Sequence, residues 1–390
     1  MKVTLLTGGS DRPYAFGIVN TLVLMGNDVD FIGSDELIAD EIIQHPKINF
    51  LNLRGNTDTK APQKEKICRI INYYLNLIRY TAKTDSKIFH ILWANRFILI
   101  DRVLMNLCYR AFGKKLFLTA HNVNQQQRDG NDNWYNRLTL RVFYSLMHHI
   151  FVHTEKMKQQ LAEDFEVPLH KISVIPFGIN NTLPNTSLLK PEARKKLNLK
   201  DGDKVFLLFG RLAKYKGLEY AIKALELLVK QDSSYRLIIA GKIEQGHENH
   251  WFEIERYIKD QRLEDFVIKK IEHIPDEEVE IYFKSADALV LPYKDIFQSG
   301  VLFLAYSFGL PVIASDVGSF REDIVVGKTG AICRPGDSQD LADTLRNFFE
   351  SDLYRNLASK SKEIMAYGNA KYSWEEVGKI TCDMYKKLVS

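Results

Sequence analysis

Short apolar runs alternate with helical patterns along the whole 390-residue chain, and this alternation constrains the fold more than any other feature. Short buried strands that are separated by helices pair in parallel and need crossover connections. We therefore expect an α/β fold with doubly wound sheets. The predicted strands are residues 2–7, 29–33, 88–92, 116–120 and 149–153 in the first half, and residues 204–209, 235–240, 266–270, 288–292 and 311–315 in the second half.

The alternation is interrupted at residues 176–200, where prolines, a glycine and paired asparagines predict a linker. A chain of this length is also too long for one hydrophobic core. Both observations predict two Rossmann-like domains, residues 1–180 and 181–373, which face each other across a cleft. Ligands of such sheets bind at the carboxyl ends of the strands, so candidate site residues are expected there.

The composition is that of a globular protein, and its charge is uneven. The net charge is +4, but residues 1–180 hold 22 Lys plus Arg against 17 Asp plus Glu, so the excess belongs to the first domain. This excess attracts anionic partners such as a membrane surface. The N-terminus lacks the regions of a signal peptide, and no apolar stretch approaches the roughly 20 residues of a membrane span. The four cysteines are widely spaced, which is typical of reduced thiols in a cytoplasmic protein.

The strongest chemical signal is the segment at residues 207–217, Leu-Leu-Phe-Gly-Arg-Leu-Ala-Lys-Tyr-Lys-Gly. Gly210 lets the backbone turn after a predicted strand, and Arg211 and Lys216 project from the loop before a helix. A diphosphate leaving group needs its developing charge neutralised, and two fixed cations can do this. Arginine offers a planar fork and lysine a compact charge. The alternative is a surface loop with solvated cations, which the position of the whole pattern at a strand end disfavours.

A second segment, residues 293–314, joins a predicted strand to an apolar helix. Ser299 is placed as the helix N-cap, and the free backbone N–H groups of a helix N-terminus form an anion site suited to a phosphate. The alternative is a plain buried helix. The predicted donor-binding residues of this segment are Gln298, Ser299, Gly300, Val301 and Leu302, of which the last three supply the N–H groups of the anion site.

The first domain offers a histidine and a glycine turn at its predicted strand ends. His121 could hydrogen-bond a sugar hydroxyl or a leaving phosphate, and the alternative is an ordinary loop histidine. Gly8 and Gly9 could let the backbone approach a phosphate or a sugar, although Gly17 comes too late for a dinucleotide fingerprint. The sequence has no HExxH, no DxD in a suitable loop, no P-loop and no nucleophile elbow. We therefore expect neither a metal site nor a cofactor.

Together these motifs resemble the family 4 retaining glycosyltransferases of the GT-B fold, over nearly the whole chain. The resemblance also includes the segments Ala-Asp-Ala-Leu-Val-Leu-Pro at residues 286–292, Asp-Val-Gly-Ser at 316–319 and Tyr-Ser-Trp-Glu-Glu-Val at 372–377. The opening loop and the His-Asn-Val-Asn stretch at 121–124 also resemble cyanobacterial exopolysaccharide transferases, including one that makes the heterocyst envelope polysaccharide.

The resemblance implies an acceptor domain at residues 1–180, a nucleotide-sugar donor domain at 181–373 and a last helix, about 374–390, that crosses back to the first domain. It implies transfer with retention at the anomeric carbon and no need for a divalent metal. Base recognition in such folds is largely through backbone near strand ends, which makes His273 and Ile274 donor-site candidates.

The resemblance also assigns roles to single residues. Arg211 and Lys216 match the family's diphosphate-binding pair, and His121 matches its acceptor-domain histidine, which contacts the donor sugar. Gly8 and Gly9 match its glycine loop near the diphosphate.

This sequence departs from the family where two glutamates are usual, because Ile296 and Leu304 stand there. The first glutamate usually touches sugar hydroxyls and the second usually holds the ribose, which apolar side chains cannot do. Asp295 is adjacent and could substitute, and the Gln-Ser-Gly motif at residues 298–300 could take over some sugar contact. A subgroup of bacterial polysaccharide-assembly transferases resembles this pattern.

The expected reaction is transfer of a hexose, for which we predict glucose, from UDP-glucose to a saccharide or a lipid-linked saccharide in exopolysaccharide assembly.

Residues 69–80 form a helical pattern of aromatic and basic residues, which would either rest on the inner face of a membrane or pack on the sheet. Two rival interpretations stay open: a nucleotide-sugar epimerase of the same fold, and a nucleotide-sugar-binding protein without turnover. No nucleic-acid partner is expected.

Overall fold

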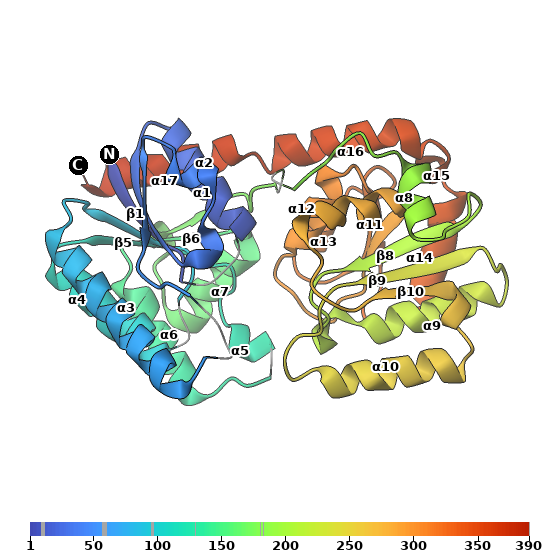
Figure 1. Ribbon diagram of the computed structural model, residues 1–390, viewed down its shortest axis with the longest axis horizontal. Helices are drawn as coiled ribbons and strands as arrows, with labels where there is room; N and C mark the ends of the chain where they lie inside the picture. Colours follow the sequence, from blue (N-terminus) through green and yellow to red (C-terminus); the bar gives the residue numbers. More distant parts are fainter. Residues whose placement is uncertain are drawn as a thin grey trace. The chain divides into compact units, whose positions relative to one another are not determined.

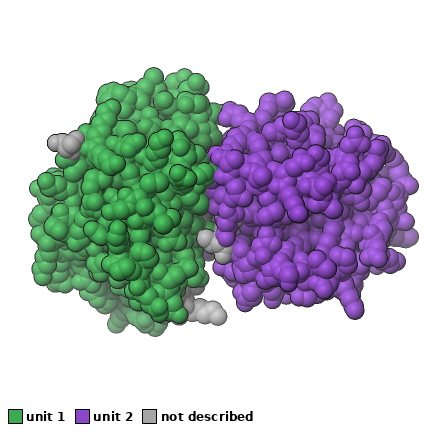
Figure 2. Space-filling model, turned by 90° about the horizontal axis from the view of Figure 1, so that it is seen from above, with its two compact units in different colours: residues 1–178, 373–390 green, residues 179–372 purple. Residues whose placement is uncertain are grey.

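The computed structural model describes residues 1–389 except 9–11, 57–60, 95–96, 129, 180 and 182. The chain divides into two compact units, coloured separately in Figure 2. Unit 1 comprises residues 1–178 and 373–390, and unit 2 comprises residues 179–372. Among the described residues, no helix combines the length and the apolar character that a membrane crossing would require.

Unit 1 is built on a seven-stranded sheet in the order β3-β2-β1-β4-β5-β6-β7, in which every neighbouring pair is parallel. The order changes direction between β1 and β4. Because these two strands are parallel, their carboxyl ends lie at the same edge of the sheet. The strands are β1 (Lys2–Leu6), β2 (Asp28–Gly33), β3 (Ile48–Asn52), β4 (Ile88–Ile91), β5 (Lys115–Thr119), β6 (His149–Val152) and β7 (Ile172–Val174).

Helices cover both faces of this sheet (Figure 1). The helices α3, α4 and α6 lie together along one face, while α1, α2 and α17 lie on the other. A short π-helix at Ile100–Leu104 leads directly into α4. The helices of unit 1 are α1 (Arg12–Leu24), α2 (Asp40–Ile43), α3 (Gln63–Lys83), α4 (Met105–Ala111), α5 (Gln125–Arg128), α6 (Trp134–Leu146), α7 (Glu155–Phe165) and α17 (Trp374–Val389).

The last helix, α17, packs against the first, α1, and closes the core of unit 1. Glycines allow this close approach: a Cβ at Gly17 would lie 2.0 Å from the Trp374 ring, and one at Gly378 would lie 2.3 Å from Thr21. The α17 side chains Val377, Cys382 and Tyr385 join the same buried cluster.

Unit 2 is built on a six-stranded parallel sheet in the order β10-β9-β8-β11-β12-β13. Its order changes direction between β8 and β11. The strands are β8 (Lys204–Phe209), β9 (Tyr235–Ala240), β10 (Val267–Lys270), β11 (Ala288–Leu291), β12 (Val312–Ser315) and β13 (Gly330–Cys333). The helices are α8 (Lys190–Lys196), α9 (Leu218–Val229), α10 (Glu248–Asp260), α11 (Val279–Ser285), α12 (Gly300–Ser307), α13 (Phe320–Asp323), α14 (Ser338–Glu350), α15 (Asp352–Arg355) and α16 (Leu357–Lys371). The prediction of doubly wound parallel α/β domains is confirmed.

The prediction that residues 176–200 form a linker is wrong for their second half, which is part of unit 2. Pro191 stands in the first turn of α8, where its missing N–H costs nothing, so it starts a helix instead of marking a break. Arg194 of α8 is buried, and its guanidinium donates to the Asp287 carboxylate at 2.9 Å and to the Ser285 carbonyl at 3.1 Å.

Candidate functional site

The sequence motifs lie at the carboxyl ends of parallel strands, as predicted. In unit 2, Gly210 follows β8 and Tyr293 lies two residues after β11, so they flank the change in strand order. In unit 1, Gly8 and Trp93 lie two residues after β1 and β4 and flank the corresponding point. Ligands of doubly wound sheets bind at such switch points.

Glycines hold the 207–217 loop tightly against its neighbours. Gly210 has φ +93° and Gly217 has φ +67°, and a Cβ on Gly217 would lie 2.0 Å from the Pro292 carbonyl oxygen. Next to them, a Cβ on Gly241 would lie 2.1 Å from the Gly210 carbonyl oxygen. Only residues without a Cβ fit this packing, so the backbone of the loop is fixed.

Lys216 is the buried cation of this loop, with 6% of the residue exposed. Its Nζ lies 5.5 Å from the centre of the Tyr293 ring and would lie 3.3 Å from a Cβ on Gly210. The Val301 side chain would lie 3.5 Å from the same Cβ position. The structure therefore brings Gly210, Lys216 and Val301 together, with Tyr293 beside them, and the sequence predicted the first three.

Arg211 is the exposed cation of the loop. Its side chain is 75% exposed, and its Nη1 lies 3.8 Å from Glu244 Oε1. An exposed ion pair at this distance contributes little, so the guanidinium can be drawn to a stronger anion such as a phosphate.

The start of α12 agrees only in part with the predicted anion site. Ser299 occupies the N-cap position, but its side chain makes no capping hydrogen bond. The N–H groups of Gly300 and Val301 head the helix, where no intrahelical acceptor exists. The prediction that the Leu302 N–H is free is wrong, because it donates to the Ser299 carbonyl at 3.1 Å in a tight first turn.

The apolar residues that stand in place of the family's two glutamates are buried, and the polar Asp295 and Gln298 near them are more exposed. Ile296 and Leu304 are buried, so they pack into unit 2, while Asp295 is exposed. Gln298 is half-buried, and its Oε1 has no hydrogen-bond partner among the described residues. Its amide lies beside the buried Asp323 carboxyl, whose pKa is raised by burial.

The two candidates for base recognition follow β10 at the same edge of the sheet. His273 is exposed and Ile274 is buried. Their role in base recognition stays a prediction.

In unit 1, Gly8 lies against the chain that follows β4. Its φ is +51°, and a Cβ would lie 1.8 Å from the Trp93 carbonyl oxygen. The Gly8 carbonyl accepts a hydrogen bond from Arg54 Nη1 at 2.9 Å. Arg54 was not predicted from the sequence as a cation beside this turn. The second predicted glycine, Gly9, lies outside the described residues.

His121 sits in an aromatic cluster of unit 1. Trp93 stacks on its ring at a centroid distance of 4.4 Å and an interplanar angle of 7°, and Tyr14 meets it edge-on at 4.5 Å. His121 Nδ1 lies 3.1 Å from His153 Nε2. Burial lowers the pKa of His121 well below its usual value and that of His153 to about 4, so both rings are neutral at pH 7.

Neither His153 nor Trp93 was among the site residues predicted from the sequence. His153 directly follows β6 and Trp93 lies two residues after β4, on either side of β5 and His121. The position after a buried strand was the available signal, but the strand order that makes these residues neighbours is not written in the sequence.

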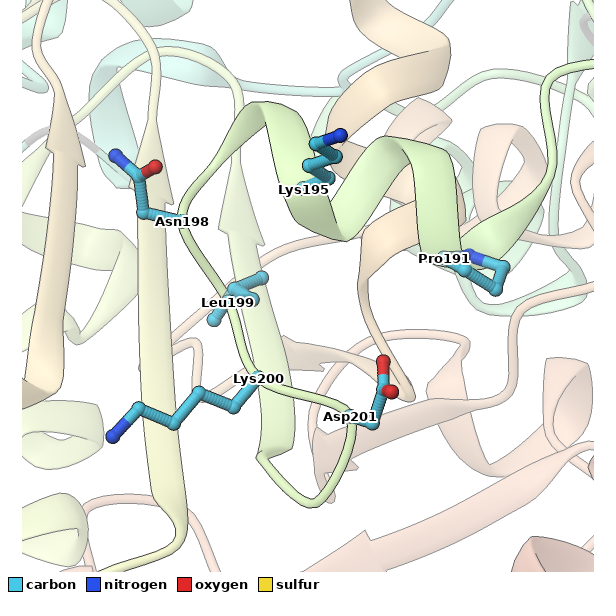
Figure 3. Close-up of a pocket in the computed structure, with 6 residues that line it drawn as sticks. All are labelled: Pro191, Lys195, Asn198, Leu199, Lys200 and Asp201. Atoms are coloured by element: carbon cyan, nitrogen blue, oxygen red, sulfur yellow. The ribbon is translucent and has the colours of Figure 1, made fainter.

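A surface hollow elsewhere in unit 2 does not belong to this site (Figure 3). It lies around α8 and the turn before β8, at the amino edge of the sheet, whereas Gly210 lies at the carboxyl edge. The charged ends of Lys195, Lys200 and Asp201 point in different directions (Figure 3). Among the described residues, no group of three or more His, Cys, Asp and Glu side chains is arranged to hold a metal ion.

Solved structures share the fold of the whole chain. Sucrose-phosphate synthase from Thermosynechococcus elongatus matches with a TM-score of 0.77 and 19% identity, covering 100% of this chain and 99% of the other. Anabaena HepE in complex with UDP and glucose also matches with a TM-score of 0.77, at 15% identity, covering 99% of this chain and 100% of the other.

The sequence comparisons agree with the fold. The D-inositol 3-phosphate glycosyltransferase of an Arthrobacter species is 26% identical over 246 residues, which are 62% of this chain and 56% of that relative, so the match spans little more than half of its length. Residues 14–183 match the model of Glycosyltransferase Family 4, and residues 190–364 match that of Glycosyl transferases group 1. The chain therefore belongs to the glycosyltransferases of the GT-B fold whose halves these two models describe.

Proposed function

We propose that the chain is a retaining glycosyltransferase that moves glucose from UDP-glucose to a saccharide or lipid-linked saccharide in exopolysaccharide assembly. Unit 2 binds the nucleotide sugar, and unit 1 binds the acceptor. The observation that carries the proposal is the buried Lys216 ammonium beside Gly210 at the switch point of unit 2. The choice of donor is supported by HepE, which has the same fold and was solved with UDP and glucose.

The diphosphate is held by one buried and one exposed cation. Lys216 is fixed in place and supplies a compact charge, while Arg211 is free to close a planar fork on the phosphate oxygens. The N–H groups of Gly300 and Val301 add an anion site at the head of α12. These groups stabilise the charge that develops on the leaving UDP.

Transfer occurs on one face of the sugar. The acceptor hydroxyl forms the new bond to the anomeric carbon on the side from which the diphosphate departs, and a diphosphate oxygen takes the hydroxyl proton. The protein contributes position and charge, and no nucleophilic carboxylate is needed. This agrees with the buried, apolar side chains at Ile296 and Leu304.

Transfer should not depend on a divalent metal. Because the two cations neutralise the diphosphate, we expect UDP release from UDP-glucose to proceed equally in EDTA and in Mg²⁺. The measurement is UDP release with a saccharide acceptor in both buffers. Loss of activity in EDTA that Mg²⁺ restores would contradict the two-cation account.

We also propose that the protein is cytoplasmic and rests on the inner face of the cell membrane. The helix α3 carries a stripe of exposed apolar side chains, Ile67, Ile71, Leu75 and Ile78, while Tyr73 and Leu77 on its other side are buried. The buried face packs on unit 1, and the exposed stripe supports the proposed contact with a membrane. Such a stripe is favourable only if something apolar covers it.

The neighbouring helices α4 and α6 lie on the same face of unit 1 (Figure 1) and also carry exposed apolar side chains. Leu107 of α4 and Trp134 and Leu138 of α6 are exposed, Trp134 to 76%. The three helices carry eight Lys and Arg side chains against a single Glu. Apolar side chains among cations suit an anionic lipid surface, which would hold a lipid-linked acceptor.

Flotation with anionic vesicles tests the lipid surface. The chain should float with phosphatidylglycerol vesicles at low salt and less at high salt, and I71E/L75E should abolish flotation. The matched control is Phe252→Glu, an exposed apolar residue of α10 in unit 2, which should float like the unchanged protein. If the unchanged protein stays unbound at low salt, or if I71E/L75E floats normally, the surface does not bind lipid.

A further inference from the structure

Two histidines of unit 1 form a hydrogen-bonded chain that begins at a backbone carbonyl. His153 Nδ1 lies 3.3 Å from the Ile175 carbonyl oxygen, and His153 Nε2 lies 3.1 Å from His121 Nδ1. His153 is buried, and His121 is held between this contact and the stacked Trp93 ring. The order of atoms fixes where each proton resides.

A carbonyl oxygen only accepts, so His153 Nδ1 must carry a proton and donate it to Ile175. The ring of His153 is neutral and holds one proton, so its Nε2 is bare and accepts. His121 Nδ1 must then carry the proton and donate it to His153. The ring of His121 is also neutral, so its Nε2 is a bare lone pair.

That lone pair has no hydrogen-bond partner among the residues of unit 1 that the structure describes. His121 Nε2 is shielded from solvent and accepts no hydrogen bond among the described residues. A buried polar atom without a partner costs stability, which indicates that a ligand supplies one. A bare imidazole nitrogen attracts an O–H donor and repels a phosphate oxygen, which is itself an acceptor.

Resting on the function proposed above, we propose that His153 is a positioning residue that holds His121 in its Nδ1–H tautomer. The site thereby selects a sugar hydroxyl, and rejects a phosphate oxygen, at His121 Nε2. Of the two partners that the sequence left open for His121, the hydroxyl is the one that this hydrogen-bond chain accepts.

The tautomer can be measured without any turnover. In the full-length protein with ¹⁵N-labelled histidine, the His121 signals, identified by their loss in His121→Gln, should show a protonated Nδ1 and a bare Nε2 at pH 7. In His153→Phe this preference should be lost. A His121 ring that carries its proton on Nε2, or on both nitrogens, in the unchanged protein would overturn the proposal even if the chain transfers sugar.

Kinetics test the selection. His153→Phe should lower kcat/KM for UDP-glucose about 10-fold, the size of one hydrogen bond, and leave the Kd of UDP unchanged. His153→Gln should keep kcat/KM within about threefold, because its amide can donate to Ile175 and accept from His121. An equal loss in both variants, no loss in either, or a weaker Kd of UDP in His153→Phe would each overturn the proposal. If the unchanged protein lacks turnover, the proposed function fails while the NMR result still decides the tautomer.

Discussion

Replacing Lys216 with alanine is expected to lower turnover of UDP-glucose on the order of 100-fold, by analogy with the loss of one oxyanion donor. The ammonium is buried beside Gly210 and Tyr293. Water and dissolved cations therefore cannot neutralise the diphosphate charge as well as this ammonium does. Its charge acts most strongly when the diphosphate takes up the electrons of the broken bond. The loss should therefore appear in kcat as well as in KM.

Arg211→Ala should also lower turnover, through loss of the second cation. The matched control is Lys214→Ala, which removes an exposed cation of the same loop and should change turnover less than twofold. Steady-state UDP release from the three variants measures this. Unchanged turnover in Lys216→Ala, or an equal loss in Lys214→Ala, would contradict the assignment of the diphosphate site.

Replacing Asp287 with alanine is expected to destabilise unit 2 by about 3–5 kcal/mol, because it leaves a buried charge without its partner. Asp287 Oδ2 accepts from Arg194 Nη2 at 2.9 Å and from the Val205 N–H at 2.8 Å, and Oδ1 accepts from Lys190 Nζ at 2.5 Å. The carboxylate thus ties α8 to the start of β8. Urea unfolding followed through the transition of unit 2 measures the effect.

The control for this change is another aspartate–arginine pair, at the surface. Arg321 donates to Asp316 in a surface ion pair whose side chains are 68% and 38% exposed, so Asp316→Ala should cost no more than about 1 kcal/mol. If Asp287→Ala is as mild as Asp316→Ala, this carboxylate does not anchor α8 to the sheet of unit 2.

The central strands were predicted from sequence because buried parallel strands are uniformly apolar. Three edge strands were missed. Two asparagines interrupt β3, β7 has only three residues, and β13 begins with glycine, so none forms a clear apolar run. Which strand neighbours which depends on packing between distant segments, and the sequence pattern does not contain it.

Site residues that lie together in one loop could be predicted from the sequence. Contacts between distant segments of the chain could not. Gly210, Gly217 and Lys216 stand in one short loop, so their type and spacing were informative. The hydrogen bond from the Leu302 N–H to the Ser299 carbonyl forms because the first turn of α12 is tight. The residue types of this segment do not predict such a turn. His153 and Arg54 reach their partners, His121 and Gly8, from other strands and loops.

Transfer from a nucleotide sugar is tested by incubating the purified chain with a panel of labelled nucleotide sugars in EDTA. We predict that UDP-glucose yields free UDP together with glucose, which is transferred to an added saccharide or slowly released to water. Exchange between sugar isomers would instead identify an epimerase, and binding without turnover would identify a protein that only holds the nucleotide sugar. Either of those two results would contradict the account.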